Sequence, residues 1–340
     1  MRTRCINFLV IGLLGAVLST HLMAGNESTP PSSKGNWFSY QQAIMGTRTV
    51  VELFSENKQQ ADLCSQRAFS ELKRIDQLMS PYIESSELYK INQQAAFKAL
   101  KISPELFKLI QHSIEFSELT EGAFDITFAS VGYLYNYREK KMPSEKQINA
   151  RLDAINYRNI QLNPDDYSIY FTNKNTRIDL GGIAKGHAVD NAIKILQKCK
   201  IENALVSAGG DSRILGDKNG RPWIVGVQHP RDKEKMVVNM PLKNEAISTS
   251  GDYERFFVEE GIRHHHIMVP STGKSANQSW SVSVLGKESV TTDALSTAMF
   301  VMGTQKGMDL INSLENTEAI IINNHGKMFY SHGLMSPNLH

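Results

Sequence analysis

The chain has 340 residues, of which 41% are hydrophobic and 21% are charged, so it can build a sizeable core, and the composition argues against global disorder. The formal net charge of +2 at pH 7 leaves no basic excess that would favour nucleic acid or an anionic membrane as the main partner.

Residues 1–24 have the order of a secretory signal peptide. Arg2 and Arg4 precede an apolar run, FLVIGLLGAVL, and small residues follow near Ala24. These 11 apolar residues are too few to span a bilayer, which takes about 20, although an uncleaved membrane anchor is the alternative. Cleavage would remove two arginines and no acid, and would lower the formal charge from +2 to 0. We therefore expect export to the periplasm, with residues 25–36 as a flexible leader.

Helices and strands are intermixed over residues 37–335, which we expect to form one catalytic unit. Helical spacing and capping residues predict helices at 59–79, 103–122, after Gly186 and at 293–302. The predicted strands are TRTVVELF (47–54), NALVSA, WIVGVQ, MVVNM, EAISTS, HHHIMV and SWSVSVL. YSIYF with RIDL, and EAIIINNHGKMFY, are each predicted to form a hairpin. Such clustered strands favour an α+β fold, with mixed and antiparallel strands packed with helices, over a doubly wound parallel sheet.

Two cysteines follow the predicted signal peptide. Cys64 falls in an apolar series at helical spacing, so we expect a buried free thiol. A disulfide with Cys199 is the alternative, because an oxidising compartment would permit it.

The segment RIDLGGIAKGHAVD contains three glycines, Gly181, Gly182 and Gly186, around Lys185. Their spacing fits neither the dinucleotide fingerprint nor the Walker motif. A phosphate cradle and a simple strand-to-helix corner explain the glycines equally well. A second paired-glycine segment, SAGGD, ends in Asp211, which could hold a ligand hydroxyl or follow a tight hairpin turn.

The segment TTDALSTAM places Asp293 and Thr297 one turn apart on a helix. A carboxylate and a hydroxyl are hard oxygen ligands suited to Mg²⁺. The simpler hypothesis is that Thr292 caps the helix, with Asp293 in its first turn.

The segment HHHIMVPSTG does not predict a zinc site. On a strand only His264 and His266 could face one ion, and no cysteine or further histidine at ligand spacing completes a site. One histidine acting as a general base is the chemically more natural role. A solvated strand-end cluster is the alternative for His264 and His265.

Taken together, these segments resemble the ApbE family of FAD:protein FMN transferases. The resemblance covers nearly the whole chain after the predicted signal peptide. It rests on collinear blocks: MGT (45–47), LMSPYIESSELYKIN (78–92), GAFDIT (122–127), DLGGIAKGHAVD (179–190), ALVSAGGD (204–211), PWIVGV (222–227), ISTSGDYERFF (247–257), HHIMVPSTG (265–273) and DALSTAMFVMG (293–303).

The resemblance implies Mg²⁺-dependent transfer of the FMN half of FAD to a Thr or Ser hydroxyl of an acceptor flavoprotein, with release of AMP. It implies that His266 is the base that activates this hydroxyl. It also implies that Asp293 and Thr297 bind Mg²⁺ through their side chains, and that the carbonyls of Gly182 and Ser296 complete the protein ligands. The positions that match FAD contacts of the family are Met45, Tyr82, Ala123, Phe124, Asp125, Asp179, Lys185 and Met268.

Three residues depart from the family pattern. Val269 stands where an aspartate usually precedes the proline, His187 where an aromatic residue commonly follows IAKG, and Ile126 where a proline is common after GAFD. Val269 lies three residues from the implied base, so it bears on the rate and on positioning of the acceptor.

The resemblance implies acceptors such as subunits of sodium-pumping NADH:quinone oxidoreductases or exported flavin reductases, met in the periplasm or at the outer face of the inner membrane. No transmembrane segment is expected after the signal. The sequence leaves two alternatives: a FAD pyrophosphatase that yields FMN and AMP, and a catalytically silent FAD-binding protein.

Overall fold

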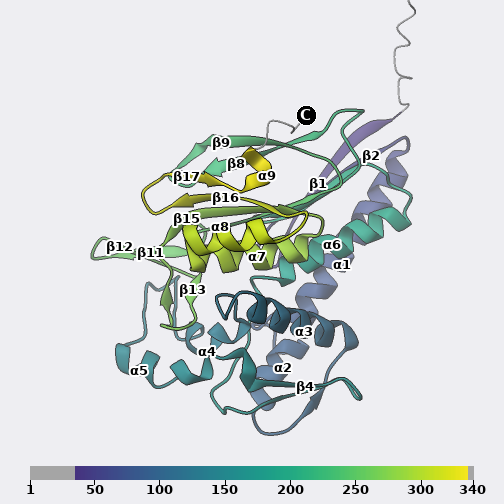
Figure 1. Ribbon diagram of the computed structural model, residues 1–340. Helices are drawn as coiled ribbons and strands as arrows, with labels where there is room; N and C mark the ends of the chain where they lie inside the picture. The colour runs from purple at the N-terminus through teal and green to yellow at the C-terminus, as the bar shows by residue number, and fades with distance from the viewer. Residues whose placement is uncertain (1–34, 336–340) are drawn as a thin grey trace, which may run out of the picture. The chain divides into compact units, whose positions relative to one another are not determined.

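The computed structural model describes residues 35–335, so the predicted signal peptide and nearly all of the predicted leader lie outside the described residues. The largest sheet has eight strands, and every neighbouring pair is antiparallel (Figure 1). In spatial order its strands are β1 (Asn36–Ile44), β2 (Thr47–Ser55), β6 (Ala204–Ala208), β7 (Asp211–Leu215), β10 (Ala246–Gly251), β15 (Ser279–Gly286), β16 (Glu318–Asn323) and β17 (Met328–Tyr330). This arrangement confirms the α+β prediction.

The two faces of this sheet are covered by different elements. Four helices lie on one face: α1 (Lys58–Met79), α6 (Ala184–Lys198), α7 (Ser289–Met302) and α8 (Thr304–Ser313). The ribbon of β8 (Trp223–His229) and β9 (Asp232–Leu242) covers the other face, together with α9 (His332–Met335). Alternate side chains of one strand enter the two cores. In β16, Ala319 and Ile321 face the helices, whereas Ile320 packs under the ribbon.

Shorter elements occupy the chain between α1 and α6. The helices are α2 (Glu87–Gln94), α3 (Pro104–Leu119), α4 (Ala129–Gly132) and α5 (Glu145–Asn149), with 3-10 turns at Ile126–Phe128, Leu152–Ala154 and Tyr157–Asn159. A small sheet has the order β3 (Leu100–Lys101), β5 (Ser168–Phe171), β4 (Ile160–Asn163). Within residues 35–335, no helix combines the length and apolar character needed to cross a membrane.

Two strand pairs separate β10 from β15. One is β11 (Phe256–Glu259) with β12 (Ile262–His265), and the other is β13 (Met268–Val269) with β14 (Lys274–Ser275). The predicted single strand HHHIMV is therefore wrong. It is split between β12 and β13, and His266 lies between them.

Local capping signals locate the early helices correctly. The side chain of Asn57 accepts the first N–H groups of α1, and the predicted apolar stripe of this helix is buried. Ser103 caps α3 with Pro104 in its first turn, as predicted, although the helix ends at Leu119 rather than at residue 122.

The predicted hairpin of YSIYF with RIDL is wrong. β5 pairs with β3 and β4, and residues 177–180 form no strand. The side chain of Asn92 takes the place of a partner strand. Its Oδ1 accepts from the N–H of Ile178 at 2.8 Å, and its Nδ2 donates to the carbonyl of Ile178 at 2.8 Å.

The helix predicted at 293–302 begins earlier, at Ser289, because a distant carboxylate caps it. Asp190 accepts from the N–H groups of Ser289 at 3.0 Å and Val290 at 2.9 Å. Thr292 is buried and shares a 2.8 Å hydrogen bond with Ser248. The hypothesis that Thr292 caps this helix is therefore wrong, and Asp293 lies beyond the first turn.

The cysteine prediction is confirmed. Cys64 and Cys199 are both free, and Cys64 is buried. Burial raises the pKa of the Cys64 thiol to about 12, and the neighbouring Cys199 thiol adds to the shift.

Candidate active site

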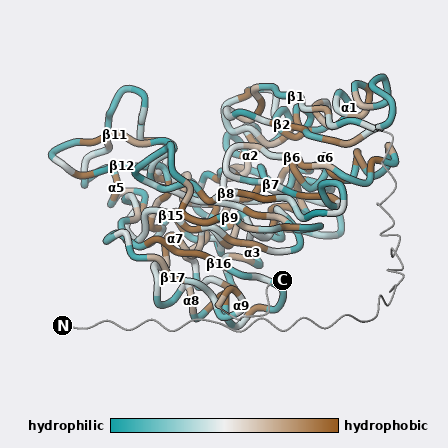
Figure 2. The backbone as a smooth tube through the Cα atoms, turned by 90° about the horizontal axis from the view of Figure 1, so that it is seen from above, coloured by the Kyte–Doolittle hydropathy of each residue, from teal (hydrophilic) through white to brown (hydrophobic). Residues whose placement is uncertain are grey.

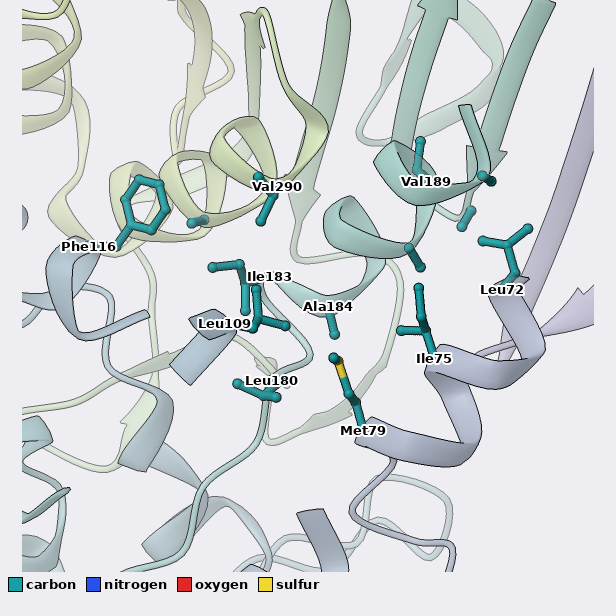
Figure 3. Close-up of a cluster of buried hydrophobic side chains, with 14 of the residues drawn as sticks. Leu72, Ile75, Met79, Leu109, Phe116, Leu180, Ile183, Ala184, Val189 and Val290 are labelled. Carbon is teal, nitrogen blue, oxygen red and sulfur yellow. The ribbon is translucent and has the colours of Figure 1, made fainter. Parts of the chain in front are cut away.

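The glycine-rich segment that leads into α6 is fixed by apolar packing. Leu180, Ile183 and Ala184 point into the core that also contains Ile75 and Met79 of α1 (Figure 3). Gly186 permits close approach of the next helix, because a Cβ there would lie 2.2 Å from the carbonyl oxygen of Ser289. Lys185, in the first turn of α6, is therefore held in a defined position.

Lys185 lies between two buried carboxylates. Its Nζ is 2.6 Å from Oδ2 of Asp211, and 3.3 and 3.2 Å from Oδ1 and Oδ2 of Asp293. Burial alone would lower the pKa of Lys185, but Asp211 and Asp293 outweigh burial and raise it, so the ammonium stays charged. Burial and the charge of Asp211 raise the pKa of Asp293, whereas Lys185 and the N–H of Gly186 oppose them.

Asp211 reaches this cluster from a hairpin. In the β6–β7 pair Ala208 lies opposite Asp211, and Gly209 and Gly210 form the turn between them. The hairpin interpretation of SAGGD is therefore confirmed. The same aspartate is 2% exposed and pairs with Lys185, so a turn residue also belongs to the charged cluster.

Oxygen atoms of α7 gather beside Gly182, one turn after Asp293. A Cβ on Gly182 would lie 3.2 Å from Oγ1 of Thr297, so the Gly182 backbone adjoins this hydroxyl. Ser250 Oγ lies 2.9 Å from Ser296 Oγ and 3.3 Å from Thr297 Oγ1. The structure thus brings together the four residues predicted to bind metal.

His266 follows β12, and its ring makes no hydrogen bond to the residues that the structure describes. Its Nδ1 is buried and has no hydrogen-bond partner among the described residues. Its backbone N–H donates to the carbonyl of Arg255 at 3.2 Å. Burial, together with the charges of Arg255 and Lys185 and the neighbouring His265, lowers the pKa of His266 to about 3. The imidazole is therefore neutral at physiological pH and can accept a proton.

Arg255 connects several predicted nucleotide contacts. A Cβ on Gly46, next to Met45, would lie 3.2 Å from its Nη2. Burial raises the pKa of Asp179, and the N–H of Gly181 and the charges of Arg255 and Lys185 oppose the shift. Met45 itself has a positive φ of 55°. The Gly46 turn and the Asp179 carboxylate are therefore the predicted nucleotide-binding segments that lie near the charge of Arg255.

Tyr82 is the predicted contact that is most open to solvent. Its side chain is 80% exposed, beyond the end of α1. Desolvation of its hydroxyl and the Asp179 carboxylate raise its pKa, whereas Arg255 lowers it. An exposed aromatic ring beside these two charges is available to stack on a flat ligand.

The remaining predicted contacts lie deeper in the protein. Phe124 is 3% exposed, and its ring adjoins Gly182, while Ala123 is half-buried in the turn before it. The Asp125 carboxylate accepts from Thr127 and from the N–H of Tyr157 at 2.9 Å, so its oxygens hold the local turn. Met268 is 4% exposed and packs against Val131 and Ile148. The structure does not bring the side chains of Asp125 and Met268 into the charged cluster.

Three residues of the site were not predicted: Asp190, Ser250 and Arg255. Asp190 falls on the buried stripe of its helix, between Val189 and Ile193, and a carboxylate on a buried helix face is a signal for a specific partner. Ser250 and Arg255 lie in ISTSGDYERFF, where the sequence gives no local sign of their partners.

The donor set fits Mg²⁺. Among residues 35–335 no group of three or more His, Cys, Asp or Glu side chains could hold a metal ion. Mg²⁺ does not need such a group, because it usually keeps water and substrate phosphate as ligands beside one or two carboxylates. Asp293, the Thr297 hydroxyl and the Gly182 backbone are hard oxygen donors, and the Asp293 carboxylate already contacts one cation, Lys185.

Comparison with known proteins gives one consistent result. Residues 45–321 match the profile of the ApbE family. A FAD:protein FMN transferase of Vibrio cholerae is 33% identical over 249 residues, which cover 70% of this chain and 72% of the relative. The ApbE protein of Thermotoga maritima, solved by crystallography, superposes with a TM-score of 0.82 at 34% identity, over 88% of this chain and 98% of that protein. The flavin transferase ApbE of Vibrio cholerae superposes with a TM-score of 0.78 at 27% identity, over 88% and 98% of the two chains.

Proposed function

Because the chain belongs to the ApbE family, we propose that it is a FAD:protein FMN transferase, which moves FMN from FAD to a Thr or Ser hydroxyl of an acceptor flavoprotein and releases AMP. The observation that carries the proposal is the composition of the site. A neutral imidazole with a free nitrogen, His266, shares one charged environment with Lys185 and with the oxygen donors of α7. Transfer of a phosphoryl-linked group to a hydroxyl needs a base and a place for anionic phosphates.

His266 is suited to take the proton of the acceptor hydroxyl. A pKa of about 3 makes it a weak base in this structure, because its imidazole is desolvated and lies near the cations Arg255 and Lys185. The negative charge of a bound pyrophosphate would offset these cations and raise the pKa. The base would therefore gain strength when FAD binds.

The proposed reaction is a substitution at the phosphorus of the FMN half. The acceptor oxygen forms a bond to the phosphorus of the FMN half, and the bond from that phosphorus to the bridging oxygen breaks. The hydroxyl proton passes to His266, and AMP leaves with the electron pair. Lys185 and Arg255, whose charges both act on His266, would hold the phosphate charge during this step.

Mg²⁺ is the proposed metal, held by the side chains of Asp293 and Thr297 and the carbonyls of Gly182 and Ser296. When bound, it would supply charge neutralisation at the pyrophosphate. The proposed FAD contacts are Met45, Tyr82, Ala123, Phe124, Asp125, Asp179, Lys185 and Met268. We place the reaction in the periplasm, on the basic-then-apolar order of residues 1–24.

Intact mass of an FMN-domain acceptor tests the proposal, after incubation with the purified protein, FAD and Mg²⁺ and with AMP assayed in parallel. We expect a gain of one FMN and an equal amount of AMP, both abolished by EDTA. Release of AMP without an FMN adduct on the acceptor would mean that the protein is a FAD pyrophosphatase instead. If neither the adduct nor AMP forms while FAD still binds, and a second acceptor also stays unlabelled, the protein is a flavin-binding protein without transferase activity.

A further inference from the structure

His265, the residue before the proposed base, is buried and uses both ring nitrogens. It is 2% exposed, which corrects the alternative of a solvated strand-end cluster at this position. Its Nε2 lies 2.6 Å from the carbonyl oxygen of Ala276, and its Nδ1 lies 3.3 Å from the backbone N of Ile267. A carbonyl only accepts and an amide N–H only donates, so the ring is neutral and carries its proton on Nε2.

The backbone of His265 is also held by hydrogen bonds. Its N–H donates to Ser275 Oγ at 3.0 Å, and its carbonyl accepts from Ser275 Oγ at 2.7 Å and from the Tyr137 hydroxyl at 3.2 Å. The ring also meets Phe300 of α7 edge-on, with centroids 5.5 Å apart. His265 therefore joins the chain around the base to the helix that carries Asp293 and Thr297.

His266 has no comparable side-chain support. Catalytic histidines are usually oriented by a hydrogen bond to the second ring nitrogen. In the described part of the chain nothing bonds Nδ1 of His266, and the residue three positions on, Val269, is apolar and packs against the core. The direction of the imidazole must therefore come from the peptides on either side.

We propose that His265 is a positioning residue for FMN transfer: by bonding Ile267 and Ala276 and packing on Phe300, it fixes the peptides that flank His266 relative to α7. The proposal rests on the proposed function, in which His266 is the base. It identifies the group that orients the imidazole in place of a carboxylate. The β11–β12 hairpin connects Arg255 to His266 and projects from the rest of the protein (Figure 2). Without the contacts of His265, any displacement of this hairpin would also displace the base.

Three substitutions separate the two ring contacts. His265→Gln can keep a donor near the Ala276 carbonyl, His265→Asn can keep an acceptor near the N–H of Ile267, and His265→Leu keeps neither. His264→Leu is the matched control, because His264 is only half-buried and stacks on Phe257, and its ring makes no hydrogen bond within residues 35–335.

We expect kcat for transfer to fall about 100-fold in His265→Leu, as for a displacement of about 1 Å in a reacting group. The Gln and Asn variants should fall by less, while KM and Kd for FAD stay within about twofold of wild type in all three. His264→Leu should keep kcat within about twofold. Equal kcat losses in His264→Leu and His265→Leu, or a loss of FAD affinity that parallels kcat, would overturn the proposal.

A second measurement does not depend on activity or on the Leu variant folding. Long-range ¹H–¹⁵N spectra of the full chain with ¹⁵N-labelled histidine should show His265, assigned by its loss in His265→Gln, as a neutral ring protonated on Nε2 at pH 7. A ring protonated on Nδ1, or a charged ring, would refute the bonding scheme. If wild type transfers no FMN, the proposed function fails, while this spectrum still reports on His265 itself.

Discussion

The two halves of the site are held in place by different means. In the charged half, side chains fix one another, because Lys185 lies between Asp211 and Asp293. In the other half, the ring of His266 has no described hydrogen-bond partner, and the surrounding backbone places it. Substitutions in the charged half should therefore change stability together with activity. Substitution of the base should change activity alone at neutral pH.

The largest effect should come from His266→Ala. Loss of a general base lowers the rate by about 10²- to 10⁴-fold, so we expect transfer to fall about 10³-fold while FAD affinity and the thermal midpoint stay close to wild type. The rate comes from the mass time course, and affinity from quenching of flavin fluorescence.

His264→Ala is the control for that variant, since it removes a neighbouring imidazole outside the site. Loss of FAD binding in His266→Ala would show that this ring contacts the nucleotide instead. The base would then no longer differ from the charged half in affecting activity alone.

Lys185→Met should lower the free energy of unfolding by about 3 kcal/mol, because it leaves two buried carboxylates without their shared cation. Mg²⁺ should then raise the urea midpoint of unfolding of the variant more than that of wild type, since a metal at Asp293 supplies the positive charge that Lys185 no longer provides. Urea unfolding with Mg²⁺ or EDTA measures both effects.

Lys194→Met, on the exposed face of the same helix, is the matched control and should change stability by less than about 0.5 kcal/mol. If Lys185→Met is as stable as this control, the charged half does not depend on its ion pairs.

Asp190→Asn tests whether the cap that α6 provides to α7 stabilises the charged half of the site. Asp190 caps α7 and pairs with Arg213 at 2.5 Å, so the amide should lower stability by about 2 kcal/mol through the weaker cap and the unpaired guanidinium. Chemical unfolding measures the change, with the exposed Asp309→Asn of α8 as control. A variant no less stable than this control would mean that α7 needs no cap from α6.

Elements with local signals could be predicted from the sequence, and elements with distant partners could not. α1 and α3 carry their caps and apolar stripes within a few residues, and both were located. The start of α7 depends on Asp190, and the backbone of Ile178 on Asn92, and neither partner is visible in a local pattern.

The candidate site divides along the same line. Family resemblance predicted part of each half, and the structure brings the predicted residues Gly182, Lys185, Asp293 and Thr297 together. The family resemblance could not predict the role proposed for His265, because in the sequence His265 is only the second of three consecutive histidines. Its burial follows from contacts with Ala276 and with Phe300 of a later helix, and only the tertiary fold creates these.

The last prediction concerns the pH dependence of stability, which reports on the base itself. The folded-state pKa of His266, about 3, lies below the unfolded value of about 6.5. The unfolded chain therefore takes up the proton first, and stability is lost as pH falls from about 6.5 toward 3. The contribution approaches about 1.4 kcal/mol per pH unit for one such group.

His266→Gln removes this group, so its stability should fall less steeply than that of wild type between pH 6.5 and 4.5. Urea unfolding with EDTA at several pH values measures both slopes, and the carboxylates common to the two proteins cancel in the difference. His265 stays in both, and burial lowers its pKa as well, so the variant should keep part of the slope. Identical slopes would mean that His266 titrates alike in both states, and its imidazole would then not be held in the buried, cation-flanked setting on which its role as base depends.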